Sequence, residues 1–308
     1  MPFLIILEQI LALFLILFFG YFLRAKEVIT RKNQKFLFKL LIDYILPFLI
    51  ISAMTVEINS ELIDNAKILF ICWVFVYLLL IISANIFKRF IKADAKETRT
   101  FEFLVIFSNV GYMGLPIIGS IYSETGIFYG SLGMIPFNIV IWTYGIYLLS
   151  SGKKENSDRL QNIINNGVLA IGIGFILFVT GIELPGPIFE AVEMIGDMTF
   201  PLSMLIIGSS LYGIDIKKVV FKPKLVFLSL LRLLIIPVIL LLALNFLPIP
   251  AILVGVIVIQ AAMPIAANSV IFAARYQGDY QLASEAVFIS TLFSIISIPG
   301  IIWLIRLI

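Results

Sequence analysis

Two stretches of the sequence place proline, glycine and amide side chains inside segments that are otherwise strongly apolar. They read Phe107-Ser108-Asn109-Val110-Gly111-Tyr112-Met113-Gly114-Leu115-Pro116 and Gln260-Ala261-Ala262-Met263-Pro264-Ile265-Ala266-Ala267-Asn268-Ser269. Proline removes a backbone donor and clashes with the preceding turn, so each stretch is expected to break a helix. Broken helices expose amide donors and helix N-termini that favour an anion. The alternative is that these residues only kink the helices for packing.

The candidate substrate-binding residues are the polar and helix-breaking positions of the two stretches, with one asparagine from the segment that follows the first stretch. They are Asn109, Gly111, Tyr112, Gly114, Pro116, Asn138, Gln260, Pro264, Asn268 and Ser269. Asn138 joins them because it follows Pro136 within one helical turn.

Two aspartates are candidates for coupling transport to a proton or another cation. Asp43 stands four residues before Pro47, and Asp197 stands four residues before Pro201, both in apolar segments. Ionisable groups inside a membrane are costly and usually functional. The alternative role is to cap the half-helix that each proline begins. Other ionisable residues lie nearer the ends of apolar segments, where snorkelling or capping accounts for them: Glu8, Glu102, Arg232, Glu285 and Arg306.

The elements that must position these residues are membrane-spanning helices. Hydrophobic residues make up 61% of the chain and charged residues 13%, against about 25% charged in soluble domains. Apolar runs near the length that crosses a bilayer recur along the whole chain. Ten spans are predicted near residues 3–23, 36–55, 68–87, 103–122, 127–150, 163–181, 194–211, 225–247, 249–275 and 283–305.

Lysine and arginine gather in alternate loops. The rich loops hold Arg24 to Lys39, Lys88 to Arg99, Lys153 to Arg159, Lys217 to Lys224, and Arg275. The positive-inside rule makes these loops cytoplasmic, which predicts a multi-pass protein of the cytoplasmic membrane with both termini outside.

An inverted repeat is indicated by matching positions in the two halves of the chain. The Asp-x-x-x-Pro pattern occurs in the second and seventh predicted spans, and Pro116 and Pro264 fall in the fourth and ninth. We therefore expect an all-α membrane protein, one transporter domain over 1–308, built from inverted five-helix repeats at 1–150 and 160–308. Its helices 4 and 9 are expected to be proline-broken and crossed, which is typical of a secondary transporter.

Several function classes lack their sequence signatures. The chain has no histidine, one cysteine and no phosphate-binding loop, metal-ligand spacing or nucleophile elbow. We expect no cofactor, no metal, no nucleic-acid partner and no enzymatic activity. An intramembrane enzyme acting through Asp43 and Asp197 is the remaining formal alternative.

At the first stretch the chain resembles the auxin efflux carrier family. Asn109 to Pro116 matches the family's Asn-x-x-x-Met-Gly-x-Pro segment, and Gln260 to Pro264, followed by Phe272-Ala273, is also similar. The family contains plant PIN auxin exporters and bacterial permeases described for malate and malonate. The similarity extends over all 308 residues.

The resemblance implies a homodimer with an architecture like that of sodium/bile acid symporters. Helices 1, 2, 6 and 7 would form a scaffold, and helices 3–5 and 8–10 a transport domain with elevator-type alternating access. Asn109 would meet the substrate carboxylate, Pro116 and Pro264 would be the crossover prolines, and Asn138 would replace a glutamine of plant members. Asp64 and Lys67 are not spaced like the plant carriers' acid–base pair, and the long central loop is absent, which argues against auxin as the substrate.

The sequence thus predicts a secondary transporter of small organic anions, mono- or dicarboxylates, embedded in membrane lipid. Proton coupling, sodium coupling and uniport all fit. The alternative is a membrane receptor or channel that binds an organic anion at the crossover without coupled transport.

Overall fold

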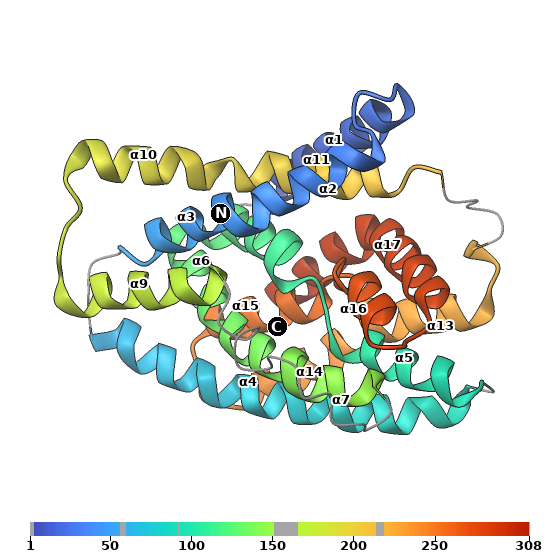
Figure 1. Ribbon diagram of the computed structural model, residues 1–308. Helices are drawn as coiled ribbons and strands as arrows, with labels where there is room; N and C mark the ends of the chain where they lie inside the picture. The colour runs from blue at the N-terminus through green and yellow to red at the C-terminus, as the bar shows by residue number, and fades with distance from the viewer. Residues whose placement is uncertain (1–2, 56–59, 92, 151–165, 214–218, 308) are drawn as a thin grey trace. The chain divides into compact units, whose positions relative to one another are not determined.

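The computed structural model describes residues 3–55, 60–91, 93–150, 166–213 and 219–307. Within these ranges the chain is helical and contains no β-strand, apart from an isolated antiparallel bridge between Ser108 and Ile265 (Figure 1). This confirms the all-α class. The start of the sixth predicted span, at 163–165, and the basic loop 153–159 lie outside the described residues, as do Lys92, Lys217 and Lys218.

The described part of the first half of the chain is helical, and π-helical turns interrupt some of its helices. Its elements are α1 Phe3–Ala25, α2 Arg31–Leu40, η1 Leu41–Ile45, α3 Leu46–Ala53, α4 Ser60–Phe87, η2 Lys88–Phe90, α5 Ala95–Ile106, η3 Val110–Gly114, α6 Leu115–Val140, η4 Ile141–Gly145 and α7 Ile146–Leu149. The second half contains α9 Asn166–Thr180, α10 Gly186–Asp197, α11 Thr199–Ser210, α13 Pro223–Leu230, η5 Leu231–Ile235, α14 Ile236–Asn245, α15 Ala251–Ala262, α16 Ser269–Arg275 and α17 Tyr280–Leu307.

Six helical stretches of the described chain are long and apolar enough to cross a membrane: Lys32–Ala53, Glu61–Phe90, Val110–Leu149, Gly186–Ser210, Pro223–Asn245 and Tyr280–Leu307. Shorter apolar helices are Leu11–Ala25, Asn166–Thr180 and Ala251–Ala262. Ser123, with φ 54° and ψ −149°, interrupts α6 between the fourth and fifth predicted spans. The ninth predicted span is divided between α15 and α16. The number of ten spans and their inverted repeat stay predictions.

Prolines account for most of the π-helical turns. The turns η1, η3 and η5 each end two residues before a proline, namely Pro47, Pro116 and Pro237. Proline cannot donate to the carbonyl four residues earlier, and its ring crowds that carbonyl, so the preceding turn widens. These helices are therefore irregular near the middle of the apolar segments rather than at their ends.

The chain divides into two compact units. Unit 1 comprises 1–67, 111–132 and 164–213, and unit 2 comprises 68–110, 133–163 and 214–308. The division falls inside α4 and inside α6, so these two helices contribute residues to both units.

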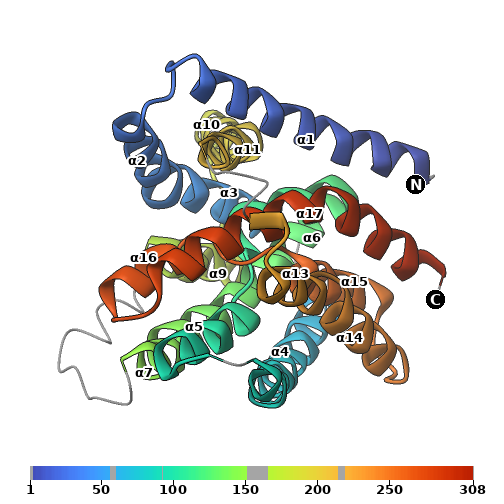
Figure 2. The ribbon, with the colours of Figure 1, turned by 90° about the vertical axis from the view of Figure 1, so that its right-hand side faces the viewer.

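Unit 1 is held together by close helix packing. Helix α1 packs against α11, which Figure 2 shows end-on beneath α1 (Figures 1 and 2). A Cβ built on Gly208 would fall on the carbonyl oxygen of Leu17, and one on Gly20 would fall on that of Leu205. These reciprocal contacts require glycine, because small residues let helix backbones approach in a membrane protein. The Gln34 amide also donates to Ser209 Oγ, at 3.0 Å.

Unit 2 surrounds the broken segments with buried helices. Helix α14 packs against α15, and α17 packs against α13, α15, α16 and α5 (Figure 2). Aromatic rings pack beside α5. The ring centroid of Phe103 lies 4.6 Å from that of Phe107 and 5.7 Å from that of Phe272. The ring centroid of Trp142 lies 4.8 Å from that of Phe272. This packing fixes the ends of α5 and the start of α16, where the candidate site lies.

We predict that Gly208→Ala lowers the apparent melting temperature of the purified protein in detergent. The added methyl group must push α1 and α11 apart, at a cost of about 1–3 kcal/mol in free energy of unfolding. Gly172→Ala is the matched control, since Gly172 lies in helix α9 with no neighbour within 4 Å of the built Cβ. Equal melting temperatures for the two variants would contradict the packing role of Gly208.

Candidate functional site

The two stretches that the sequence singles out meet as antiparallel extended backbone in unit 2. Helix α5 ends at Ile106 and α15 ends at Ala262, and Phe107 and Met263 are both extended. The Asn109 amide donates to the Pro264 carbonyl at 2.8 Å, and the Ala266 amide donates to the Phe107 carbonyl at 3.1 Å. We call this element, residues 107–109 and 263–266, the crossover bridge.

Side chains satisfy further backbone groups of the crossover bridge. The Ser108 hydroxyl donates to the Gln260 carbonyl at 2.9 Å, and the Ile265 amide donates to Ser290 Oγ of α17 at 3.2 Å. Backbone groups without water must be paired inside the protein, so these bonds stabilise the break in both helices. Ser290 has no signal in the sequence, because serine is common in apolar helices and its partner is 25 residues away.

Polar groups remain around the bridge. Asn109 is 4% exposed, and Gln260 and Ser269 are fully buried. Asn268 Oδ1 and Ser269 Oγ have no hydrogen-bond partner within the described residues. A hydroxyl and amide groups of this kind can bind a carboxylate through neutral hydrogen bonds.

Gly133 packs closely against Trp73 and Gln260. A Cβ built on Gly133 would lie 2.6 Å from Trp73 Nε1 and 2.7 Å from Gln260 Oε1, so a larger residue would displace one of these side chains. The Trp73 indole N–H has no hydrogen-bond partner in the part of the chain that the structure describes. The sequence offered no signal for Trp73, since tryptophan in a span normally indicates packing or the interfacial belt.

The Asn138 side chain is held by a hydrogen bond to its own helix. Its amide donates to the Met134 carbonyl at 2.8 Å, one turn earlier, and the side chain is buried in unit 2. Its predicted contact with substrate stays a prediction.

The other residues of the first stretch belong to unit 1. Gly111, Tyr112 and Gly114 lie in η3, and Pro116 is in the first turn of α6. The Tyr112 ring packs edge-on against Phe38 of α2, with ring centroids 6.0 Å apart. The sequence grouped these residues with Asn109, and that grouping stays a prediction.

The two candidate coupling aspartates lie in unit 1 at helix irregularities. Asp43 is in η1, and its carbonyl, which Pro47 cannot reach, accepts a 2.7 Å bond from Asn166 Nδ2. Asp197 is exposed and ends α10. Neither is the N-cap of the following helix, because Ile45 and Met198 hold those positions. The coupling role stays a prediction.

Arg232 differs from the sequence-based expectation. It was expected near a span end, where snorkelling would carry its charge to water, but its side chain is fully buried in η5 between α13 and α14. The prediction that the Arg232 side chain snorkels to water is therefore wrong. The available signal was a single charge within the apolar run 225–247.

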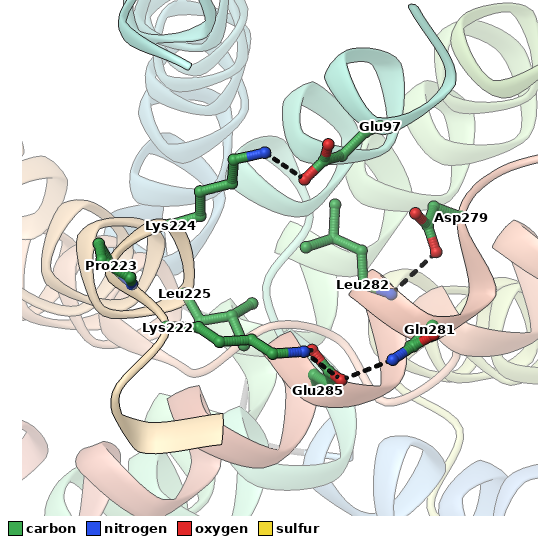
Figure 3. Close-up of a pocket in the computed structure, with 9 residues that line it drawn as sticks. All are labelled: Glu97, Lys222, Pro223, Lys224, Leu225, Asp279, Gln281, Leu282 and Glu285. Carbon is green, nitrogen blue, oxygen red and sulfur yellow. Dashed lines mark hydrogen bonds and ion pairs between the residues drawn. The ribbon is translucent and has the colours of Figure 1, made fainter. Parts of the chain in front are cut away.

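Glu285, Glu97 and Glu102 form ion pairs. Lys222 Nζ donates to both carboxylate oxygens of Glu285, at 2.6 and 2.7 Å, and Lys224 Nζ donates to Glu97 at 2.8 Å. These two ion pairs line a cavity of about 360 Å³ (Figure 3). Glu102, buried, accepts Lys88 Nζ at 2.6 Å. Snorkelling or capping was expected for Glu285 and Glu102, and pairing with lysine replaces it.

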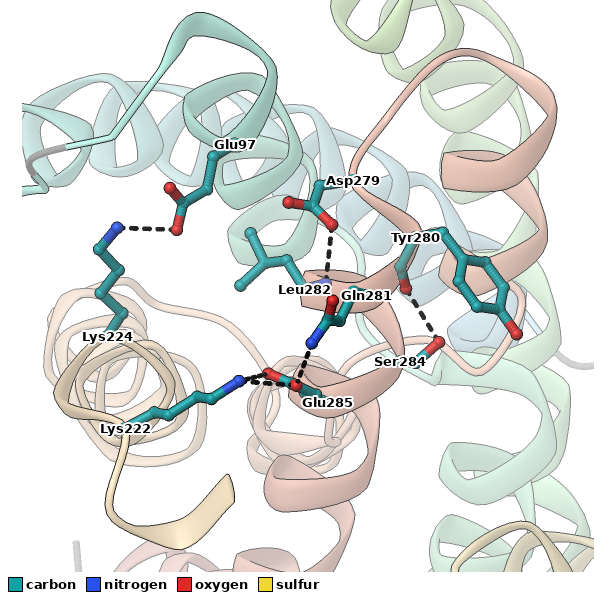
Figure 4. Close-up of polar contacts among 9 residues, drawn as sticks. All are labelled: Glu97, Lys222, Lys224, Asp279, Tyr280, Gln281, Leu282, Ser284 and Glu285. Carbon is teal, nitrogen blue, oxygen red and sulfur yellow. Dashed lines mark hydrogen bonds and ion pairs between the residues drawn. The ribbon is translucent and has the colours of Figure 1, made fainter. Parts of the chain in front are cut away.

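The ion pairs connect the N-terminal ends of α5, α13 and α17. The Gln281 amide also donates to Glu285, and Asp279 Oδ1 accepts the Leu282 amide at 3.0 Å, as an N-cap does (Figure 4). Because both lysines are neutralised by carboxylates, the cavity offers no unpaired positive charge. We interpret it as a structural clamp of unit 2.

A family model described as a membrane transport protein matches residues 5–302. The chain belongs to this family. The match confirms the resemblance to the auxin efflux carrier family. The chain is 23% identical over 304 residues to an uncharacterized transporter of Methanocaldococcus jannaschii, covering 95% of this chain and 96% of the relative. It is 22% identical over 315 residues to the uncharacterized transporter YfdV of Escherichia coli, covering 97% and 98%.

The family and the apolar helices together identify a multi-pass membrane protein of a transporter family. The relatives are similar over nearly their full length, so the comparison applies to the whole chain rather than to one segment of it.

We predict that Lys222 and Glu285 stabilise unit 2 by about 1 kcal/mol through their pairing, measured as the coupling energy of Lys222→Met and Glu285→Gln in a double-mutant cycle. Their side chains are 43% and 17% exposed. The control cycle is Lys67→Met with Asp64→Asn, an ion pair of 2.8 Å whose side chains are 68% and 66% exposed and whose coupling should be near zero. A coupling no larger than in the control would contradict the clamp.

Proposed function

We propose that the chain is a secondary transporter that moves small organic anions, mono- or dicarboxylates, across the cytoplasmic membrane. The observation that carries the proposal is the crossover bridge, in which two broken helices of unit 2 present buried amide and hydroxyl groups around paired backbone. Irregular backbone at membrane depth is tolerated where it lines a binding cavity, and it is typical of transporter sites. The membrane transport family supports the same class.

The mechanism we propose is elevator-type alternating access, in which one compact unit carries the substrate past the other. Residues of the predicted spans 1, 2, 6 and 7 fall within unit 1, and those of spans 3, 8, 9 and 10 fall within unit 2, which supports a scaffold and a transport domain. Residues 111–132, from the fourth and fifth spans, group with unit 1. The proposed assembly is a homodimer with both termini outside.

Binding in the proposed site depends on neutral donors. Asn109 would orient the substrate carboxylate, with Gln260 and Ser269 beside it, and the paired backbone would keep these groups in place without water. Hydrogen bonds to a charged group contribute about 1.5–3 kcal/mol each, so a few of them offset much of the cost of dehydrating a carboxylate.

The test is flux of labelled malate, malonate and indole-3-acetate into liposomes that contain the purified protein, with and without an imposed pH gradient. Saturable uptake at carrier rates supports the proposal, and a response to the gradient supports proton coupling. Currents far above carrier turnover would indicate a channel, and binding without flux would indicate a receptor. Either result would overturn transport as the function.

We predict that Asn109→Ala weakens binding of the transported acid by about tenfold or more, the loss of one hydrogen bond to a charged group. The bridge itself should persist, because the Asn109 backbone amide rather than its side chain bonds Pro264. Asn245→Ala, at the exposed end of α14, is the matched control. Unchanged affinity in a folded Asn109→Ala protein would remove this residue from the site.

A further inference from the structure

Arg232 is a buried positive charge that forms no ion pair with the residues that the structure describes. Its side chain is 0% exposed, and Nε, Nη1 and Nη2 all lack a hydrogen-bond partner among the residues described. A guanidinium does not lose its proton in proteins, so the charge cannot be removed by titration. A buried, unpaired charge is strongly unfavourable, and intramembrane charges are therefore usually functional.

The position of Arg232 prevents it from reaching water along its own helix. It lies nine residues after Pro223, about 14 Å along the helix axis, and farther still from Asn245. The turn that carries it, η5, packs against α15 and α17 in the interior of unit 2. Burial of Arg232 is thus set by tertiary packing on several sides.

No carboxylate of the surrounding described helices is available to neutralise Arg232. Helices α13, α14 and α15 contain no acidic residue. The acid of α17, Glu285, is ion-paired with lysine, and the acids of α4, Glu61 and Asp64, lie more than three turns before Tyr77. A bound anion would supply the counter-charge that these described helices lack.

The groups near Arg232 are also donors. The charge of Arg232 acts on the buried Tyr77 phenol, whose ring lies 5.6 Å from that of Trp73, one turn earlier on α4. The Trp73 indole N–H packs against Gly133, and Gln260 Oε1 packs against the same glycine. Gln260 in turn is bonded through its carbonyl to Ser108 of the crossover bridge. A guanidinium, a phenol and an unpaired indole N–H together are complementary to an oxyanion.

We infer that Arg232, with Tyr77 and Trp73, forms an anion subsite that binds a carboxylate of the transported organic acid. The inference rests on the proposed function in that the anion is the substrate. It names the substrate's counter-charge: a fixed arginine rather than a bound cation. A lipid phosphate has similar oxyanion chemistry, and the experiment separates the two sources.

The experiment measures labelled malate binding and the apparent melting temperature in phospholipid-free detergent, with and without malate. The variants are Arg232→Met, Arg232→Lys and the control Arg275→Met, an exposed arginine that lies over the Tyr276 ring. We expect Arg232→Met to lose at least about tenfold in malate affinity, the scale of a lost buried charge pair. Arg232→Lys should bind more tightly than Arg232→Met, and Arg275→Met should match the parent protein.

The melting temperature separates binding from a structural role. Without malate, Arg232→Met should melt at or above the parent protein, because an unpaired buried charge has been replaced by an apolar side chain. Malate should raise the melting temperature of the parent and of Arg275→Met but not that of Arg232→Met. A ligand-free Arg232→Met protein that melts well below the parent, or that binds malate with parental affinity, overturns the subsite.

The lipid source is tested by adding phosphatidylglycerol in place of malate. If only the lipid stabilises the parent, and Arg232→Met abolishes that effect, the carboxylate subsite is overturned.

Measurements of flux and of malate binding test the proposed transport and the subsite separately. Parental flux with unchanged malate affinity in Arg232→Met overturns the subsite alone, whereas absent flux with Arg232-dependent malate binding overturns the proposed transport and retains the subsite. Absence of both overturns both.

Discussion

Pairing of backbone groups where no water is available is the constraint on which this structure depends. Prolines interrupt the apolar helices near their middles, and each one leaves a carbonyl without its usual donor. At Pro264 the carbonyl without its usual donor is that of Gln260, which accepts the Ser108 hydroxyl, and at Pro47 it is that of Asp43, which accepts the Asn166 side chain. Widened π-helical turns before Pro47, Pro116 and Pro237 absorb the rest of the strain locally. Broken helices can therefore persist inside a membrane protein.

Packing within each unit follows from the same environment. Lipid tails are as apolar as leucine, so helices gain little from hiding side chains and associate instead through close van der Waals contact. In unit 1 that contact is glycine against backbone, between α1 and α11. In unit 2 it is aromatic packing beside α5 and ion pairs near the N-terminal ends of α5, α13 and α17. Glu97 and Glu285 are thus paired with lysines near helix ends.

Unit 2 concentrates polar groups that lack partners in the described chain. Asn268, Ser269, Trp73 and Arg232 all have buried polar atoms without a hydrogen bond. Each such group weakens the folded state, and the donors among them, the Ser269 hydroxyl, the Trp73 indole N–H and the Arg232 guanidinium, are complementary to a small anion. A transporter needs this balance, because a site that is fully satisfied when empty gains little from its substrate. Stability and binding therefore compete for the same residues.

The sequence by itself determined the all-α membrane class, the two helix-breaking stretches and the family, because hydropathy, proline and a contiguous motif are local signals. The sequence named both Asn109 and Pro264 as candidate site residues, since both lie beside a break in an apolar run, and their backbone hydrogen bond is a finding of the structure. Tertiary structure alone decided that Ser290 supports the bridge, that Gly133 packs against Trp73, and that Arg232 is buried rather than snorkelling. The ion pair of Glu285 with Lys222 is likewise visible only in the tertiary structure. These outcomes depend on which faces of distant helices meet, and a pattern along one helix carries no information about the side chains that another helix brings to it.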